Sequence, residues 1–86
     1  MSKKIVVTIY SKPGCCLCDE AKANILASPC CHQIELREVN IETDAELFER
    51  YRYEIPVIFI GERKAFKYHV TAQEFCARLR RHLNGE

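Results

Sequence analysis

The 86-residue sequence has no tryptophan, only three glycines and three prolines, and almost no net charge, because 13 basic residues nearly cancel 12 acidic ones. Without a surplus of one sign, the composition gives no indication of a nucleic-acid partner or an anionic membrane surface. The apolar stretch near the N-terminus, residues 5–10, is too short for a signal-peptide core, and no run approaches the roughly 20 apolar residues of a membrane-spanning helix. We therefore expect a soluble protein of the cytoplasm with no nucleic-acid or membrane partner, although an organelle such as the mitochondrion stays open.

The sequence also has no linker, repeat or low-complexity segment. A chain of this length buries roughly 60–65% of its unfolded surface, which is enough to fold alone on a modest core. We expect one domain over residues 1–86, and a monomer.

Cysteine, in contrast, is common, with six residues: Cys15, Cys16, Cys18, Cys30, Cys31 and Cys76. A secreted disulfide framework is one explanation, since such frameworks form in oxidising compartments. However, no export signal is evident, and two pairs of these cysteines are sequence neighbours, which rarely pair with each other. A reducing compartment with reactive or metal-binding thiols fits the sequence better.

The hydrophobic pattern predicts strands at residues 4–10, 34–41, 57–60 and 64–68, and helices at 15–27, 43–53 and from Thr71 onward. The element order is therefore βαβαββα. The first crossover makes the first two strands parallel, and the closing hairpin adds two antiparallel strands. The sequence thus predicts an α/β fold, a mixed four-stranded sheet with helices on both faces. The alternation of the second strand breaks at Glu38, which leaves its register open.

Two of the helices have a recognisable start signal. Thr43-x-x-Glu46 and Thr71-x-x-Glu74 both have the spacing of a capping box, in which side chain and backbone satisfy each other's polar groups. The apolar stripes expected to be buried are Leu17, Ala21 and Ile25 in the first helix, Leu47, Phe48 and Tyr51 in the second, and Phe75, Cys76, Leu79 and Leu83 in the last. Cys76 is then most simply a small core residue.

The candidate reactive groups lie in the segment Cys15-Cys16-Leu17-Cys18, between the first strand and the first helix. A helix N-terminus has free N–H groups and the positive end of the helix dipole, so it stabilises a thiolate on Cys15. Lys12, in the same turn, adds positive potential. Cys18 follows nearly one helical turn later on the same side, where it can attack a mixed disulfide on Cys15. A Cys-x-x-Cys pair in a βαβ context favours redox chemistry.

The segment from Lys12 to Cys18 resembles the active-site turn of glutaredoxins, and Ile55-Pro56-Val57 resembles the Thr-Val-Pro stretch of the thioredoxin superfamily. The resemblance spans nearly the whole chain and is greatest to the short glutaredoxin-like branch. It implies a thioredoxin-like fold and a thiol–disulfide oxidoreductase, with Cys15 as nucleophile and Cys18 as resolving cysteine. It also implies a cis-proline at Pro56, which would turn the Ile55 backbone toward an extended substrate.

The resemblance makes Lys12, Ile55 and Pro56 the candidate substrate-binding residues, and a disulfide-containing protein or a small thiol the expected partner. Typical glutaredoxins bind glutathione through a Gly-Gly pair and a nearby Asp after the hairpin, and residues 66–73 lack both. The sequence therefore implies no firm cofactor, and glutathione stays a candidate reductant only. A second departure is Cys16, which stands where glutaredoxins usually have proline.

The alternative is a metal- or iron–sulfur-binding module that uses Cys15, because thiolate and imidazole are good ligands for zinc and iron–sulfur clusters. Such a centre could lie between two subunits with a thiol cofactor, and Cys16 adds a possible ligand. Cys30-Cys31-His32 follows the first helix and could supply further ligands. However, a helix of about 13 residues would hold these residues about 20 Å from Cys15, far beyond a zinc–sulfur bond of about 2.3 Å. We expect Cys30, Cys31 and His32 to form an ordinary loop.

Overall fold

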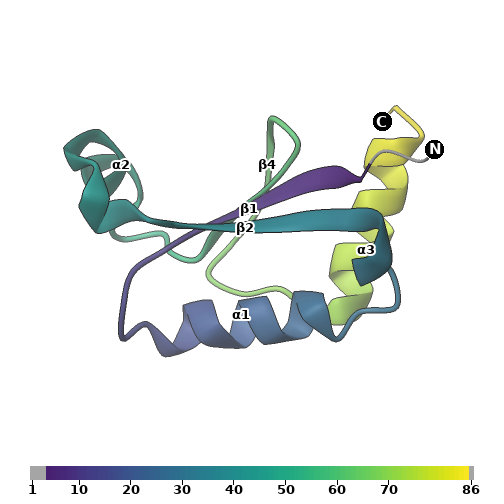
Figure 1. The fold of residues 1–86 in the computed structure, drawn as a ribbon, viewed down its shortest axis with the longest axis horizontal. Coiled ribbons are helices and arrows are strands. Elements are labelled where there is room, and N and C mark those ends of the chain that lie inside the picture. The colour runs from purple at the N-terminus through teal and green to yellow at the C-terminus, as the bar shows by residue number, and fades with distance from the viewer. Residues whose placement is uncertain (1–3, 86) are drawn as a thin grey trace.

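The computed structural model describes residues 4–85 and contains one mixed sheet of four strands in the order β2-β1-β3-β4. The strands are β1 (Ile5–Ser11), β2 (Ile34–Asn40), β3 (Val57–Ile60) and β4 (Arg63–Lys67). The helices are α1 (Cys16–Leu26), α2 (Ala45–Tyr51) and α3 (Ala72–Leu83), with short 3₁₀ turns η1 (Cys31–Gln33) and η2 (Ile41–Thr43). The order along the chain confirms the predicted βαβαββα arrangement (Figure 1).

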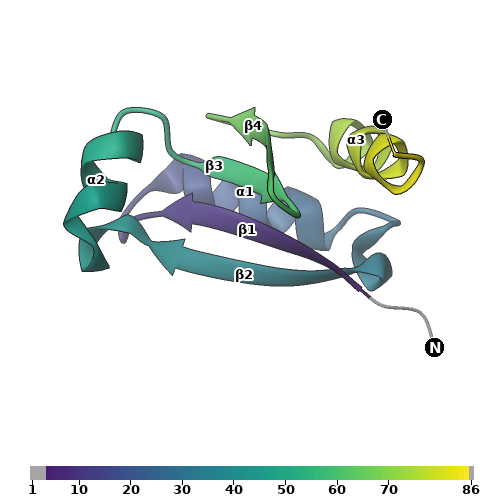
Figure 2. The same ribbon diagram turned by 90° about the horizontal axis from the view of Figure 1, so that it is seen from above.

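Strand β1 lies inside the sheet, parallel to β2 and antiparallel to β3, and β3 forms the antiparallel hairpin with β4 (Figure 2). The sequence left the register of β2 open at Glu38, and in the structure Glu38 pairs with Ile9 of β1. The C-terminal ends of β1 and β2 point toward α2, so the turn that follows β1 lies at the same end of the sheet as α2 (Figure 2).

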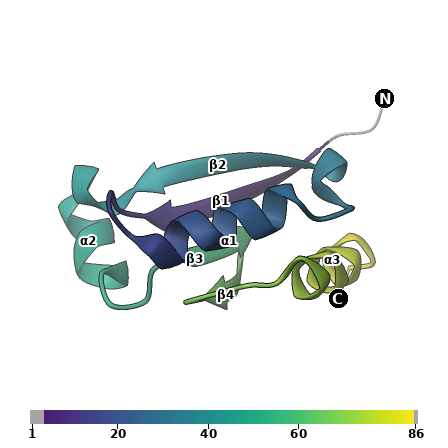
Figure 3. The same cartoon turned by 90° about the horizontal axis from the view of Figure 1, so that it is seen from below.

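One face of the sheet is covered by α1 and α3 (Figure 3). The alternation of each strand directs one set of side chains to this face. The larger core cluster lies here and is built mainly from Val7, Ile9, Ala21, Ile25, Ile58, Ile60, Phe75 and Leu79. Figure 3 shows α1 lying across β1 and β3, with α3 beside the C-terminal end of α1.

A second, smaller cluster lies at the end of the sheet beside α2, which Figure 1 shows on the opposite side of the sheet from α1. Tyr10 of β1 stacks on Tyr51 of α2 with ring centroids 4.9 Å apart, and Phe59 of β3 meets Tyr10 edge to face at 5.5 Å. Cys18 and Ile55 are buried in the same cluster. Helices therefore cover both faces, as predicted, and the second cluster supports the turn that carries the cysteines.

Helix α1 differs from the prediction in its start and in its buried stripe. It begins at Cys16 rather than Cys15, which is the N-cap. Its buried residues are Cys18, Ala21 and Ile25, whereas Leu17, predicted to be buried, is 47% exposed. The arc that faces the sheet passes through positions i, i+3 and i+7 of the helix, which places Cys18 inside and Leu17 outside.

The two predicted capping boxes have different outcomes. Thr71 caps α3 and shares a capping box with Glu74, as predicted. For α2 the prediction is wrong, because the N-cap is Asp44, whose carboxylate accepts hydrogen bonds from the N–H groups of Glu46 and Leu47 at 2.9 and 3.3 Å. Thr43 instead donates its hydroxyl to the carbonyl of Asn40 at 2.7 Å.

The last helix brings a further correction. Leu83, predicted to lie in the buried stripe, is 51% exposed. Cys76 is not a free core thiol but forms a disulfide with Cys30, 46 residues earlier, with the two Cα atoms 5.8 Å apart. Cys15, Cys16, Cys18 and Cys31 are free. Between residues 4 and 85, no helix is both long enough and apolar enough to cross a membrane.

Candidate active site

The turn between β1 and α1 is shaped by its glycine. Gly14 has a φ of +78°, in the left-handed region that glycine adopts without steric cost. An added Cβ would meet no atom within 4 Å, so only the backbone conformation requires glycine here. The chain then extends through Cys15, at φ −91° and ψ 106°, before α1 begins. Cys15 therefore sits at the N-cap position, next to the free N–H groups of the first turn.

The two thiols of the Cys-x-x-Cys motif meet across this first turn. The backbone N–H of Cys18 donates to the Sγ of Cys15 at 3.3 Å, so a sulfur occupies the capping place that serine or aspartate usually takes. Cys15 is half-buried, whereas Cys18 is only 1% exposed. Cys16 lies outside the pair and is exposed. The arrangement has one thiol open to a reaction partner and a second thiol beneath it.

The burial of Cys18 also affects its protonation. Burial, helped by a hydrogen bond with Cys15, raises the pKa of the Cys18 thiol to about 12, although a hydrogen bond from the backbone of Lys12 acts in the opposite direction. Cys18 is therefore a neutral thiol at physiological pH and holds a proton close to the sulfur of Cys15.

The remaining predicted site residues lie around this pair. The Ile55–Pro56 peptide bond is cis, as the family resemblance implies. Pro56 is fully buried, Ile55 is 8% exposed, and Cys15 packs against the cluster that contains Ile55 and Cys18. Lys12 reaches Cys18 through its backbone, and its side chain is exposed. The structure thus brings Cys15, Cys18 and Ile55 together and leaves the charged group of Lys12 at the surface.

Comparison with known proteins gives the family. The sequence model of the Glutaredoxin-like domain (DUF836) matches residues 6–83. The chain belongs to this family. Among solved structures, the target protein XcR50 from X. campestris is similar at 27% identity with a TM-score of 0.73, over 87% of this chain and 96% of that protein. The solution structure of protein Ne2328 from Nitrosomonas europaea shares the fold, with a TM-score of 0.74 at 24% identity over 92% of this chain and 95% of that one. These similarities support the thioredoxin-like fold predicted for this glutaredoxin-like domain.

A polar cavity of about 320 Å³ lies beside the turn between β1 and α1 of this glutaredoxin-like domain. It is lined by Ser11, Lys12, Pro13, Gly14, Asp19, Glu38 and Asn40. The Glu38 carboxylate accepts a hydrogen bond from the hydroxyl of Ser11 and pairs with Lys22, both at 3.2 Å. Glu38 was not among the site residues predicted from the sequence, although the break in strand alternation at this residue was a signal that its side chain has a special position.

The metal-binding alternative has little support in this domain. Among residues 4–85, no group of three or more histidine, cysteine, aspartate or glutamate side chains is placed to hold a metal ion. Cys30, one of the proposed additional ligands, is bonded to Cys76. The donor set around Cys15 therefore does not fit a metal site built from the chain's own residues.

Proposed function

We propose that this glutaredoxin-like domain is a thiol–disulfide oxidoreductase that uses Cys15 as nucleophile and Cys18 as resolving cysteine. The observation that carries the proposal is the pair itself: a half-buried sulfur that caps α1 and a buried, protonated thiol whose backbone N–H points at that sulfur. Membership of the glutaredoxin-like family supports a redox role for such a pair.

In the first step, the thiolate of Cys15 attacks one sulfur of a substrate disulfide. A bond forms between Cys15 and that sulfur, the substrate S–S bond breaks, and the other substrate half leaves as a thiolate. The attacking anion is stabilised by the Cys18 N–H and by the positive end of the α1 dipole. The proton held on Cys18 is available to the departing group.

In the second step, Cys18, whose proton has passed to the thiolate released in the first step, attacks the sulfur of Cys15. The bond between Cys15 and the substrate breaks, the remaining substrate half leaves as a thiolate, and a Cys15–Cys18 disulfide remains. The substrate has then gained two electrons and the protein has lost two. A second thiol compound, with glutathione as the candidate, must reduce the protein before the next turnover.

The substrate is proposed to lie along the chain before Pro56. Among residues 4–85, no hydrogen bond occupies the backbone of Ile55, whereas the carbonyl of Pro56 accepts one from the N–H of Tyr68 at 2.9 Å. An extended segment on either side of a substrate cysteine could pair with the Ile55 backbone and align its sulfur with Cys15. The exposed ammonium group of Lys12 would favour an anionic group on that segment. A disulfide-containing protein or a small disulfide meets these requirements.

The proposal is tested by replacing each free cysteine in turn and measuring the reduction of a mixed disulfide substrate. Cys15→Ser should abolish turnover, and Cys18→Ser should accumulate a covalent adduct between Cys15 and the substrate that mass spectrometry detects. Cys16→Ser and Cys31→Ser are the matched controls, because both remove a free thiol outside the proposed pair. These controls should keep turnover within about twofold of the unchanged protein, as is usual for surface substitutions. Full reductase activity in Cys15→Ser would refute the proposal.

A further inference from the structure

A second sulfur pair lies at the other end of α1. The disulfide between Cys30 and Cys76 joins the segment after α1 to α3. The 11 residues of α1 separate this bond from the Cys-x-x-Cys turn, which corresponds to about 16 Å at 1.5 Å per residue. Figures 1 and 3 show α1 running from the turn on the side of α2 toward α3. Cys15 therefore cannot reach this disulfide within one molecule.

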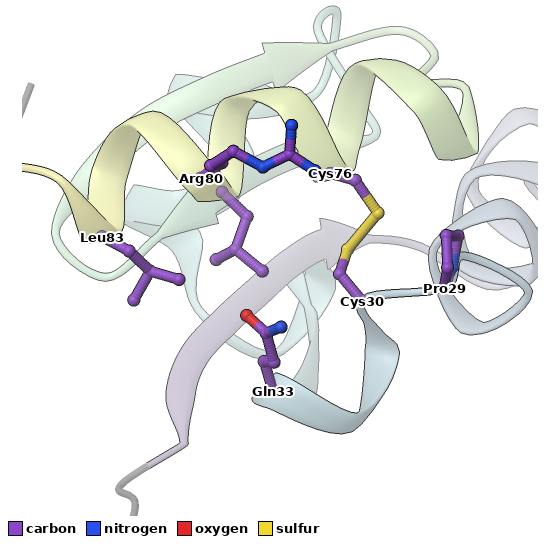
Figure 4. A pocket seen from close by; sticks show the side chains of 7 residues that line it. Pro29, Cys30, Gln33, Cys76, Arg80 and Leu83 are labelled. Atoms are coloured by element: carbon purple, nitrogen blue, oxygen red, sulfur yellow. A yellow bond between two sulfur atoms is a disulfide. The ribbon is translucent and has the colours of Figure 1, made fainter.

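Both cysteines of the disulfide line a cavity of about 300 Å³, which offers a small molecule a route to the bond. The lining residues are Pro29, Cys30, Gln33, Cys76, Leu79, Arg80 and Leu83 (Figure 4). Cys76 is half-buried and Cys30 is 9% exposed, so Cys76 is the more accessible of the two sulfur-bearing residues. A cavity of this size lies at the lower end of the range for small-molecule sites.

The cavity has a cationic side and a polar amide around the disulfide. Figure 4 shows the side chain of Arg80 extending along α3 in the direction of Cys76, and the side chain of Gln33 pointing up from η1 toward α3. A guanidinium group presents a planar set of N–H donors that matches a carboxylate. The chemistry that fits the cavity is therefore a thiol on a small molecule that also carries a carboxylate.

A hydrogen-bond acceptor lies beside the sulfur of Cys30 that only the reduced thiol can use. The hydroxyl of Ser28, a residue only 2% exposed, donates to the carbonyl of Ile25 at 2.6 Å, and its oxygen lies 3.4 Å from the Sγ of Cys30. A disulfide sulfur carries no proton, so it has nothing to donate to this oxygen. Once Cys30 is a thiol, its S–H can donate to the oxygen of Ser28. Reduction thus adds a buried hydrogen bond that the disulfide lacks.

We propose that the Cys30–Cys76 disulfide is a second redox site, opened by a low-molecular-weight thiol that binds the cavity through a carboxylate on Arg80. This site acts independently of the Cys15–Cys18 pair, so it does not rest on the proposed function.

The exchange follows the accessibility of the two sulfurs. The thiolate of the small molecule attacks the Sγ of Cys76, a mixed disulfide forms there, and Cys30 leaves as a thiolate that takes up a proton from water. A second molecule of the same thiol attacks the mixed disulfide. It releases Cys76 as a thiol and the two small molecules as their disulfide. Two electrons enter the protein, and two thiols are oxidised to one disulfide.

The decisive test removes every other thiol. In the full-length variant Cys15→Ser, Cys16→Ser, Cys18→Ala, Cys31→Ser, only Cys30 and Cys76 remain. Reduced glutathione, which carries carboxylates, should convert their disulfide to two thiols while circular dichroism still reports the folded protein. Mass spectrometry after alkylation should detect the glutathione adduct on Cys76 as the intermediate. Peptide mapping of the unchanged protein provides the same readout should the variant fold poorly.

The role of Arg80 is tested by the ratio between the rate of disulfide reduction in a variant and the rate in the unchanged protein. Arg80→Ala should slow reduction by glutathione about threefold, the size expected for one exposed charge pair, and should leave reduction by the uncharged 2-mercaptoethanol unchanged. Arg81→Ala is the matched control, since Arg81 carries the same charge one residue further along α3 and does not line the cavity. Because each ratio compares variants with the same reductant, differences in thiol reactivity cancel.

The buried acceptor is tested at equilibrium in glutathione buffers. Ser28→Ala should shift the ratio of dithiol to disulfide toward the disulfide by about fivefold, the size of one neutral buried hydrogen bond. A Cys30–Cys76 pair that does not oxidise in air, or that stays oxidised in excess glutathione until the protein unfolds, would overturn the proposal. Equal slowing by Arg80→Ala and Arg81→Ala would overturn the binding of the carboxylate in the cavity.

Discussion

The backbone N–H of Cys18 donates to the sulfur of Cys15 at 3.3 Å, so the two thiols of the motif share the first turn of α1 but differ in their access to solvent. Cys15 is half-buried and Cys18 is 1% exposed. A reagent from solution therefore meets Cys15 first. This asymmetry is what a nucleophile and a resolving thiol require, because the first attack must start from one defined sulfur.

The asymmetry predicts selective alkylation. In a reduced Cys16→Ser, Cys31→Ser background, iodoacetamide at pH 7 should modify Cys15 faster than Cys18 by about tenfold or more, since only an accessible thiolate reacts at a useful rate. Peptide mass spectrometry over a time course gives both rates in one sample. Denaturation in urea is the control, and it should make the two rates similar. Equal rates in the folded protein would contradict the structure of the pair.

The buried thiol also makes stability depend on pH. The pKa of Cys18 is raised from its ordinary value of 9.0 to about 12, with burial as the main cause. Between these values the folded state keeps a proton that the unfolded chain has lost, so the free energy of unfolding should fall as pH rises above 9, by at most about 1.4 kcal/mol per pH unit. Below pH 9 both states hold the proton and this contribution is fully present.

Urea unfolding at several pH values measures this slope. The informative quantity is the difference between the unchanged protein and Cys18→Ala, which should lose stability less steeply with pH. Cys31→Ala, which removes a half-buried free thiol elsewhere, should keep the original slope. A slope that is the same in all three proteins would show that Cys18 titrates normally.

Much of this fold could be predicted from local sequence signals. The β-branched run of β1, the short hairpin between β3 and β4 and the Thr71 capping box each depend on neighbouring residues, and all three are present in the structure. The predicted helix over residues 43–53 required a choice between two adjacent capping residues, Thr43 and Asp44, and the spacing to Glu46 alone favoured the wrong one.

The site was predictable only in part, because sequence signals are local and some of its contacts join residues far apart in the chain. A Cys-x-x-Cys motif after a strand predicts two neighbouring thiols, and the structure has them on one turn. The bond between Cys30 and Cys76 depends on α3 packing beside the end of α1, which no local pattern encodes across 46 residues. Glu38 lies by the cavity beside the turn because of the parallel register of β1 and β2, which its sequence left open.

The corrected start of α2 gives a direct prediction. Asp44→Ala removes the acceptor for the N–H groups of Glu46 and Leu47 and should lower the free energy of unfolding by about 1 kcal/mol. Asp44→Asn keeps a side-chain oxygen at the same position and should stay within a few tenths of a kcal/mol of the original, as asparagine caps about as well. Equal losses in both variants, measured by urea unfolding, would mean that the charge matters rather than the cap.

The Cys30–Cys76 disulfide should stabilise the fold by restricting the unfolded chain. It closes a loop between residues 46 positions apart, for which the loss of chain entropy predicts a contribution of about 2–4 kcal/mol to the free energy of unfolding. Cys76→Ala should lose this amount under oxidising conditions, while Cys31→Ala should not, because Cys31 is outside the bond. Reduction of the unchanged protein should bring its stability down toward that of Cys76→Ala. If urea unfolding gives the same free energy for the oxidised and reduced unchanged protein, the bond does not constrain the chain in solution, and packing of residues such as Phe75 and Leu79 is enough to hold α3.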